Sequence, residues 1–348
     1  MRDFNIKKLV RANVVGLKPY SSARDEYKAV GEEMIFLDAN ENPFSSDVNR
    51  YPDPQQRNLK AQLAKIKGIP VESILLGNGS DEVLDLLFRA FCEPGTDNVI
   101  SLPPTYGMYS VLAGINNVEN REVLLDSNFQ PNVPEILEKV DANTKMIFLC
   151  SPNNPSGNSF ASDKVEEILM NFKGLVVIDE AYIDFSEKES WLQRLNNFPN
   201  LVITQTLSKA YGLAAIRLGI LYASEEIISI LNRIKPPYNV NQLTQERALE
   251  ELKDQEKLNT QVAVILKERA KLNSALKGVD LIKEIYESDA NFILVKVDDA
   301  NKRYEQLIEK GIVVRNRSSQ PLCESTLRLT VGTKSENEKL LNALKSLN

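Results

Sequence analysis

The sequence of 348 residues contains no histidine. Imidazole is the commonest general base of enzymes and the commonest metal ligand of proteins. Its absence excludes Ser-His-Asp and Cys-His catalytic sites, histidine-ligated zinc and the usual imidazole proton shuttles. Any proton transfer must therefore use lysine, tyrosine, cysteine or a carboxylate, and we expect no metal site.

Cysteine, basic clusters and long apolar runs are also scarce. Cys92, Cys150 and Cys323 are far apart and odd in number, which fits neither a disulfide framework nor a metal-ligand motif. With a net charge of -6 and no Lys/Arg block longer than a pair, neither nucleic acid nor an anionic membrane is an expected partner. No stretch approaches the roughly 20 apolar residues that cross a bilayer, and Met1 to Val15 lacks the apolar part of a signal peptide. We expect a cytoplasmic protein.

Short apolar runs alternate with helical segments between about residues 73 and 225. Each run is bounded by turn-forming residues, which is typical of buried strands in a mostly parallel sheet. Between the first two runs, Asp81 to Phe91 has an apolar helical face, and Ser80 is a candidate N-cap. The pattern predicts an α/β fold. The predicted strands are Ile74 to Leu76, Val99 to Leu102, Met146 to Cys150, Leu175 to Ile178, Leu201 to Thr204 and Leu218 to Tyr222.

The C-terminal third has a different pattern. Residues 242 to about 276 are rich in Glu, Lys, Leu and Ala and predict one or two long helices. Two predicted strands and two predicted helices then form a small α+β unit: strands at 290–297 and 327–331, helices near 304–310 and 335–347. We expect residues 1–40 to form an N-terminal arm and part of the small domain, 41–240 the large domain, and 241–348 the interdomain helix and small domain.

Lys209 has neighbours that suit pyridoxal phosphate chemistry. It follows Thr206 and Ser208 and precedes Arg217 by eight residues. An amine can form a Schiff base with an aldehyde cofactor. Hydroxyl groups and a guanidinium can bind the phosphate of the same cofactor.

Asp179 directly follows the predicted strand Leu175 to Ile178. A carboxylate there can keep a pyridine nitrogen protonated, which makes the ring an electron sink. Tyr182, three residues later, can donate a hydrogen bond to the phenolic oxygen of the cofactor. An isolated aspartate after a strand is more often a turn cap. Its combination with Lys209 favours the cofactor interpretation.

Three further polar segments also follow predicted strands, where ligands of open parallel sheets bind. Asn154 is a second donor for the phenolic oxygen. Ser80 and Asp81 begin a helix whose N–H groups and dipole can bind phosphate, although a capped helix after a glycine turn explains this motif equally well. Tyr106 can lie over a flat ring, or it can be a core tyrosine.

Three arginines lie in the C-terminal unit. Arg328 interrupts the apolar strand residues Leu327 and Leu329, and a buried arginine needs an anion. An edge-strand arginine that faces water is the alternative. Either Arg315 or Arg317 can face the same anion, and we favour Arg315 because it directly follows an apolar segment.

Together these motifs resemble the fold-type I, class-II pyridoxal-phosphate-dependent aminotransferases, and more narrowly the histidinol-phosphate aminotransferase group, over nearly the whole chain. The resemblance implies a large domain with a mostly parallel seven-stranded sheet flanked by helices, and a small α+β domain. The general pattern is carried by Asn154-Pro155-Ser156-Gly157, Asp179-Glu180-Ala181-Tyr182, and Ser208-Lys209 followed by Arg217. The narrower pattern is carried by Leu37-Asp38-Ala39-Asn40-Glu41-Asn42-Pro43, Arg50-Tyr51-Pro52-Asp53-Pro54, Pro103-Pro104-Thr105-Tyr106-Gly107-Met108-Tyr109 and Lys235-Pro236-Pro237-Tyr238-Asn239.

The resemblance also implies roles for single residues. Lys209 binds pyridoxal 5'-phosphate and carries protons, Asp179 contacts the pyridine nitrogen, and Tyr106 lies against the ring. Asn154 and Tyr182 contact the phenolic oxygen. The implied phosphate ligands are Ser80, Asp81, Thr206, Ser208 and Arg217, with Tyr51 contributed by the partner subunit of a homodimer. The implied substrate-binding residues are Tyr20, Asn42, Tyr238, Arg315 and Arg328.

The implied reaction transfers an amino group between L-histidinol phosphate and 2-oxoglutarate, and yields imidazole-acetol phosphate and L-glutamate in histidine biosynthesis. One pocket then has to accept two different anions. Two alternatives share the cofactor residues. One is an aromatic amino acid aminotransferase. The other is a threonine-phosphate decarboxylase, which releases carbon dioxide and needs no 2-oxoglutarate.

Overall fold

The computed structural model describes residues 4–18 and 35–347. Its larger sheet has seven strands in the order β1-β7-β6-β5-β4-β2-β3. Strand β7 is antiparallel to β1 and β6, and the other neighbouring strands are parallel. The predicted α/β fold with a mostly parallel seven-stranded sheet is confirmed. The strands are β1 (Ile74–Asn78), β2 (Asn98–Ser101), β3 (Glu119–Glu122), β4 (Thr144–Cys150), β5 (Leu175–Asp179), β6 (Leu201–Thr206) and β7 (Leu218–Tyr222).

Six of these strands lie where the apolar runs predict them. The seventh, β3, was missed because its sequence, Glu-Asn-Arg-Glu, has no apolar residue and it lies at the sheet edge. The prediction that Ser80 caps the helix after β1 is wrong. Helix α4 (Gly79–Phe91) begins after Asn78, so Ser80 lies inside its first turn.

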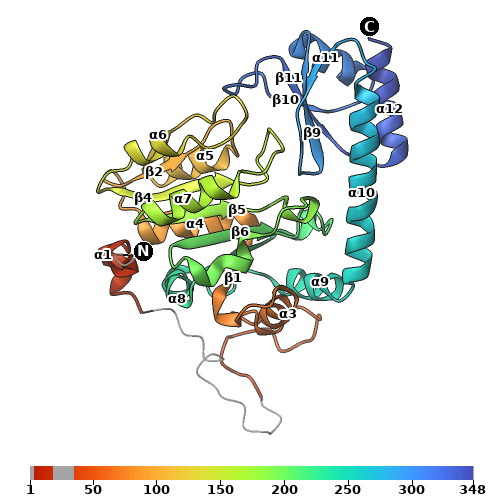
Figure 1. Ribbon diagram of the computed structural model, residues 1–348. Coiled ribbons are helices and arrows are strands. Elements are labelled where there is room, and N and C mark those ends of the chain that lie inside the picture. The colour runs from red at the N-terminus through yellow and green to blue at the C-terminus, as the bar shows by residue number, and fades with distance from the viewer. Residues whose placement is uncertain (1–3, 19–34, 348) are drawn as a thin grey trace.

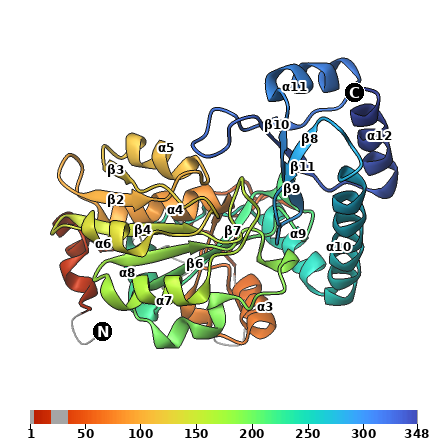
Figure 2. The ribbon, with the colours of Figure 1, turned by 45° about the horizontal axis from the view of Figure 1, so that its top comes forward.

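Two helical layers cover the larger sheet (Figure 2). Alternate residues of each strand face opposite layers, so Val176 and Ile178 pack into one core, and Leu175 and Val177 into the other. The first core includes α3 (Arg57–Lys67), α6 (Val133–Glu138), α7 (Ser162–Asn171) and α9 (Gln242–Leu252). The second includes α1 (Ala12–Val15), α4, α5 (Met108–Ile115) and α8 (Glu225–Ile234). Short 3-10 helices lie at Ile6–Lys8, Val71–Ser73, Ile183–Phe185, Trp191–Asn197 and Ala214–Ile216.

The smaller sheet is antiparallel and has the order β10-β11-β9-β8. Helix α10 (Gln255–Leu276) follows α9 and runs beside the molecule to this sheet (Figure 1), so the predicted helical stretch forms two helices. The remaining elements are β8 (Ile282–Ile285), β9 (Phe292–Val297), α11 (Ala300–Glu309), β10 (Arg315–Asn316), β11 (Thr326–Thr330) and α12 (Lys334–Lys345). Among the residues described, none of the helices combines the length and hydropathy that crossing a bilayer requires.

Candidate active site

The carboxyl ends of β4, β5 and β6 border one cavity. Cys150 and Ala181 line it together with ten residues that the sequence predicts as cofactor ligands. Convergence at this edge is what a parallel sheet predicts, because consecutive strand ends lie side by side there. The ten residues are Ser80, Asp81, Tyr106, Asn154, Asp179, Tyr182, Thr206, Ser208, Lys209 and Arg217.

Asp179 is a buried carboxylate at the end of β5, with 3% of its surface exposed. Its Oδ2 accepts a hydrogen bond from Tyr109 Oη at 2.9 Å, and its Oδ1 accepts one from the Ala181 N–H at 3.2 Å. Burial raises the pKa of Asp179, and the Tyr109 hydrogen bond opposes that rise. An electropositive group of a ligand, such as a protonated ring nitrogen, would compensate this buried charge.

Tyr109 is a site residue that the sequence prediction missed. It is fully buried in α5, and its ring stacks on Phe148 with 4.8 Å between centroids. Burial, and then the charge of Asp179, raise the pKa of Tyr109, so the phenol stays protonated and donates. Within an apolar helix a tyrosine is usually a core residue. The available signal was its place three residues after Tyr106, at the end of a polar segment that follows a predicted strand.

Groups that suit a phosphate gather between α4 and the segment after β6. Ser208 N–H donates to Thr206 Oγ1 at 3.1 Å. Arg217 Nη2 lies 3.8 Å from Asp81 Oδ2, beside the N-terminal turn of α4. The helix dipole, two hydroxyl groups and a guanidinium therefore face one part of the cavity, as a phosphate site requires.

Gly79 allows this approach of Arg217. Its φ is +76°, and a Cβ atom there would lie 2.5 Å from Arg217 Nη2. We expect Gly79→Ala to weaken cofactor binding about tenfold and to lower the free energy of unfolding by roughly 1–3 kcal/mol, the usual cost of such a backbone conformation. Fluorescence titration with pyridoxal phosphate and urea denaturation measure the two effects. Gly114→Ala is the matched control, because its Cβ meets no atom within 4 Å; equal cofactor affinity in both variants would contradict the prediction.

The amine of Lys209 lies 5.7 Å from the centre of the Tyr182 ring and lines the cavity. Partial burial lowers the pKa of Lys209, and the positive charge of Arg328 lowers it further. A lower pKa increases the neutral, nucleophilic fraction of the amine near neutral pH.

This shift predicts a pH dependence. The rate at which cofactor-free protein condenses with pyridoxal phosphate should rise with pH and level off below pH 10.5, the ordinary lysine value. Arg328→Gln removes one cause of the lowered pKa, so the midpoint should move to higher pH. Stopped-flow absorbance across a pH series measures both midpoints. An unchanged or lower midpoint in Arg328→Gln would show that this charge does not act on Lys209.

The smaller sheet contributes to the same region through Arg328. Its Nη1 donates to Asn154 Oδ1, and its guanidinium lies 5.0 Å from the centre of the Phe292 ring. Burial lowers the pKa of Arg328. Arg315 lies directly opposite Arg328 in the β10–β11 pairing and is exposed.

Three other predicted residues lie away from this cavity. Tyr51 and Tyr238 stack on each other with 4.6 Å between ring centroids, and neither is among the described residues that line the cavity. Asn42 is exposed, and its Oδ1 accepts from the Phe44 N–H at 2.9 Å. Tyr20 lies outside the described residues. Within one chain, the structure therefore does not bring Tyr51, Tyr238 or Asn42 to Lys209.

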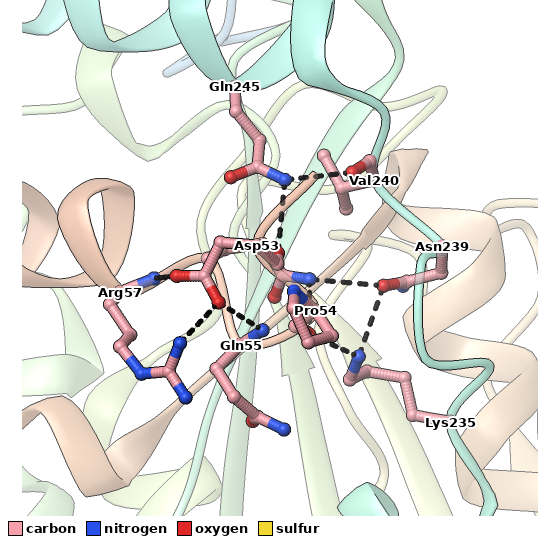
Figure 3. A network of polar contacts seen from close by, with 9 residues as sticks. Asp53, Pro54, Gln55, Arg57, Lys235, Asn239, Val240 and Gln245 are labelled. Carbon is pink, nitrogen blue, oxygen red and sulfur yellow. Dashed lines mark hydrogen bonds and ion pairs between the residues drawn. The ribbon is translucent and has the colours of Figure 1, made fainter. Parts of the chain in front are cut away.

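A polar network holds the turn after Tyr51 against the segment that contains Tyr238 (Figure 3). Lys235 Nζ donates to the Pro54 carbonyl and to Asn239 Oδ1, both at 3.2 Å. Asn239 Nδ2 in turn donates to the Leu76 carbonyl of β1 at 2.9 Å. Two motifs that are far apart in the sequence are thereby joined and fixed to the larger sheet.

Comparison with known proteins agrees with this fold. The family model "Aminotransferase class I and II" matches residues 33–344. Curated histidinol-phosphate aminotransferases of Flavobacterium johnsoniae and Christiangramia forsetii are 66% and 64% identical to the chain; the alignments cover 100% of this chain in both cases, and 100% and 99% of the relatives.

Solved structures of the same group have similar folds. The histidinol-phosphate aminotransferase of Clostridium acetobutylicum is 26% identical, with a TM-score of 0.80, over 86% of this chain and 91% of that one. The Sinorhizobium meliloti enzyme, solved with pyridoxal-5'-phosphate, is 22% identical, with a TM-score of 0.79, over 86% and 83%; at that identity it shows the fold alone. The chain therefore belongs to the class I and II aminotransferase family.

Proposed function

We propose that this chain is a pyridoxal-phosphate-dependent histidinol-phosphate aminotransferase of histidine biosynthesis. It transfers the amino group of L-histidinol phosphate to 2-oxoglutarate, and yields imidazole-acetol phosphate and L-glutamate. The observation that carries the proposal is the position of Arg328, which joins an arginine-rich strand pair to the cavity of Lys209 through Asn154. An amine in the cavity and a guanidinium bonded to a residue that lines it are therefore present together. The curated relatives with the same name support the assignment.

The cavity residues fit pyridoxal phosphate. When bound, the cofactor supplies an aldehyde that condenses with amines and a pyridine ring that accepts electrons. Asp179 would hold a proton on the ring nitrogen, because its buried charge needs a positive partner. Arg217, Ser208 and the N-terminus of α4 would hold the phosphate, and Tyr182 and Asn154 the phenolic oxygen.

Proton transfer falls to Lys209 in a chain without histidine. Its Nζ would take the proton from the substrate Cα and deliver it to the carbon on the other side of the amino nitrogen, which requires an amine that exchanges protons near neutral pH. The lowered pKa of Lys209 meets this requirement. Tyr182, whose pKa is raised by burial, stays protonated as a hydrogen-bond donor.

A half-reaction tests the proposal. The loaded enzyme is mixed separately with histidinol phosphate, phosphothreonine and phenylalanine, and its absorbance is followed. We expect rapid conversion by histidinol phosphate, with recovery of the original spectrum on addition of 2-oxoglutarate. Release of carbon dioxide from phosphothreonine would assign a decarboxylase instead. Faster conversion by phenylalanine would assign an aromatic aminotransferase.

We further propose a homodimer in which Tyr51 completes the partner's cofactor site. Tyr51 does not line the cavity of its own chain, and its segment exposes large apolar side chains, including Leu37 at 88% and Phe44 at 79%. Exposed apolar groups concentrated in one segment are typical of an interface.

The free, buried thiols of all three cysteines suit a reducing compartment, and we place the enzyme in the cytoplasm.

Mixed dimers test the shared site. Lys209→Ala and Tyr51→Ala each damage every site of their own homodimer. A hybrid of the two has one fully intact site, so random reassortment should restore about one quarter of wild-type activity. Activity is measured after co-refolding in equal amounts. No recovery beyond the sum of the separate variants would show that Tyr51 acts within its own chain or not at all.

A further inference from the structure

A second pocket, of about 430 Å³, is lined by residues of helices α3 and α8 and shares no lining residue with the cavity of Lys209. The two helices pack on β1, at the edge of the larger sheet (Figure 1). The lining combines apolar side chains, such as Ile74 and Ile228, with polar side chains and charged groups of both signs. The volume is in the range of small-molecule binding sites.

Lys60, on α3, brings an ammonium group without a partner to this pocket. Only 6% of the residue is exposed, and the group forms no hydrogen bond or ion pair with the residues that the structure describes. Asp53 is the acid that acts on it, but both Asp53 oxygens already accept hydrogen bonds from Arg57, at 2.7 Å each (Figure 3). Burial, and then the charge of Lys235, lower the pKa of Lys60 to about 8. A buried charge of this kind needs an anion.

Asn232, on α8, has the opposite need. Its Oδ1 is buried and accepts no hydrogen bond within the described part of the chain. Buried polar atoms without partners are rare in proteins, so a donor is expected at this position. The carboxylates of Glu72 and Glu225 line the same pocket, and they favour a donor with a positive charge. The pocket therefore suits a ligand that has both an anionic and a cationic group.

We propose that this pocket binds a free α-amino acid with an aliphatic side chain. The ligand carboxylate pairs with Lys60, and the ligand ammonium donates to Asn232. A simple anion would leave Asn232 unsatisfied, and a simple amine would leave Lys60 unpaired, so the zwitterion is the class that serves both. The apolar lining at Ile74 and Ile228 accommodates the side chain. This inference does not depend on the reaction at Lys209, because the two sites have no residue in common.

Three probes that share one carbon skeleton test the class of ligand. L-Valine is compared with isovalerate, which lacks the ammonium, and with isobutylamine, which lacks the carboxylate. Each is titrated by calorimetry at pH 7 into the pyridoxal-phosphate-loaded enzyme, which is first reduced with borohydride so that added amines do not react with the cofactor. We expect saturable binding of L-valine, and binding of the other two probes that is at least about tenfold weaker, the effect of losing a hydrogen bond to a charged group.

Variants test the position of the site. Lys60→Met and Asn232→Leu each remove one binding group, and we expect L-valine affinity to fall about 10- to 100-fold in both. Lys65→Met, at an exposed position of the same helix, and Arg328→Gln, beside the cavity of Lys209, should bind L-valine like wild type. Lys60→Met removes an unpaired buried charge, so its urea midpoint should be higher than that of wild type. Loss of binding in a variant that is more stable cannot result from loss of the fold.

Three results would overturn the proposal. Absence of saturable heat with L-valine in wild type would remove the site. Loss of binding in Arg328→Gln but not in Lys60→Met would place the ligand beside Lys209 instead. Equal affinities for isovalerate and L-valine would make the pocket a site for anions and exclude the amino acid. The half-reaction with histidinol phosphate tests the proposed function separately, and its outcome leaves these results unchanged.

Discussion

Replacing Lys209 with alanine is expected to lower the rate of the half-reaction by roughly 10⁴-fold, the upper end of what one general base contributes. The variant loses both the amine that binds the cofactor aldehyde and the group that moves the Cα proton. The phosphate-binding groups, Arg217 and the N-terminus of α4, are unchanged, so the cofactor should still bind, with lower affinity. Rapid mixing with histidinol phosphate measures the rate, and fluorescence titration measures the affinity.

Two controls separate chemistry from structure in that experiment. Lys267→Ala removes an exposed lysine of α10 and should react like wild type. Added methylamine should restore part of the activity of Lys209→Ala, because a free amine can replace the missing one without any change in the fold. A rate in Lys209→Ala within tenfold of wild type would exclude Lys209 as the catalytic amine.

The larger sheet and the cavity residues were predictable because their signals are local. Continuous apolar runs identify β1 and β5 from sequence alone, and the carboxyl end of β5 places Asp179 at the edge where ligands bind. Strand β3 has no such signal, since its side chains are polar and its position depends on pairing with β2.

Longer-range relations could not be predicted in the same way. Tyr109 has the sequence context of a core residue, and only the packing of α5 against the sheet brings its hydroxyl to Asp179. The sequence does not separate Arg315 from Arg317, because only the folded chain makes Arg315 exposed and Arg317 partly buried. Tyr51 and Tyr238 are joined by stacking across nearly 190 positions, a distance over which no periodicity in the sequence acts.

The charge of Asp179 gives the second large expected effect. Asp179→Asn keeps the volume of the side chain but removes its negative charge, so a protonated ring nitrogen would lose its partner. Breaking a buried charge pair costs about 3–5 kcal/mol, which corresponds to roughly 10²- to 5 × 10³-fold in rate. Asp163→Asn, at an exposed position in α7, is the matched control and should leave the rate unchanged.

Tyr109→Phe provides an intermediate step between wild type and Asp179→Asn. It removes one hydrogen bond to the carboxylate and leaves the charge, so the rate should fall by about 10- to 100-fold. The Tyr109 hydrogen bond lowers the pKa of Asp179 against the opposing effect of burial. Without it the pKa rises further, and the acidic limb of the pH–rate profile should move to higher pH. If Tyr109 is only a packing residue, phenylalanine, which keeps the ring that stacks on Phe148, should leave that limb in place. A shifted limb in Tyr109→Phe, with a normal unfolding midpoint, would show that the phenol controls the charge of Asp179.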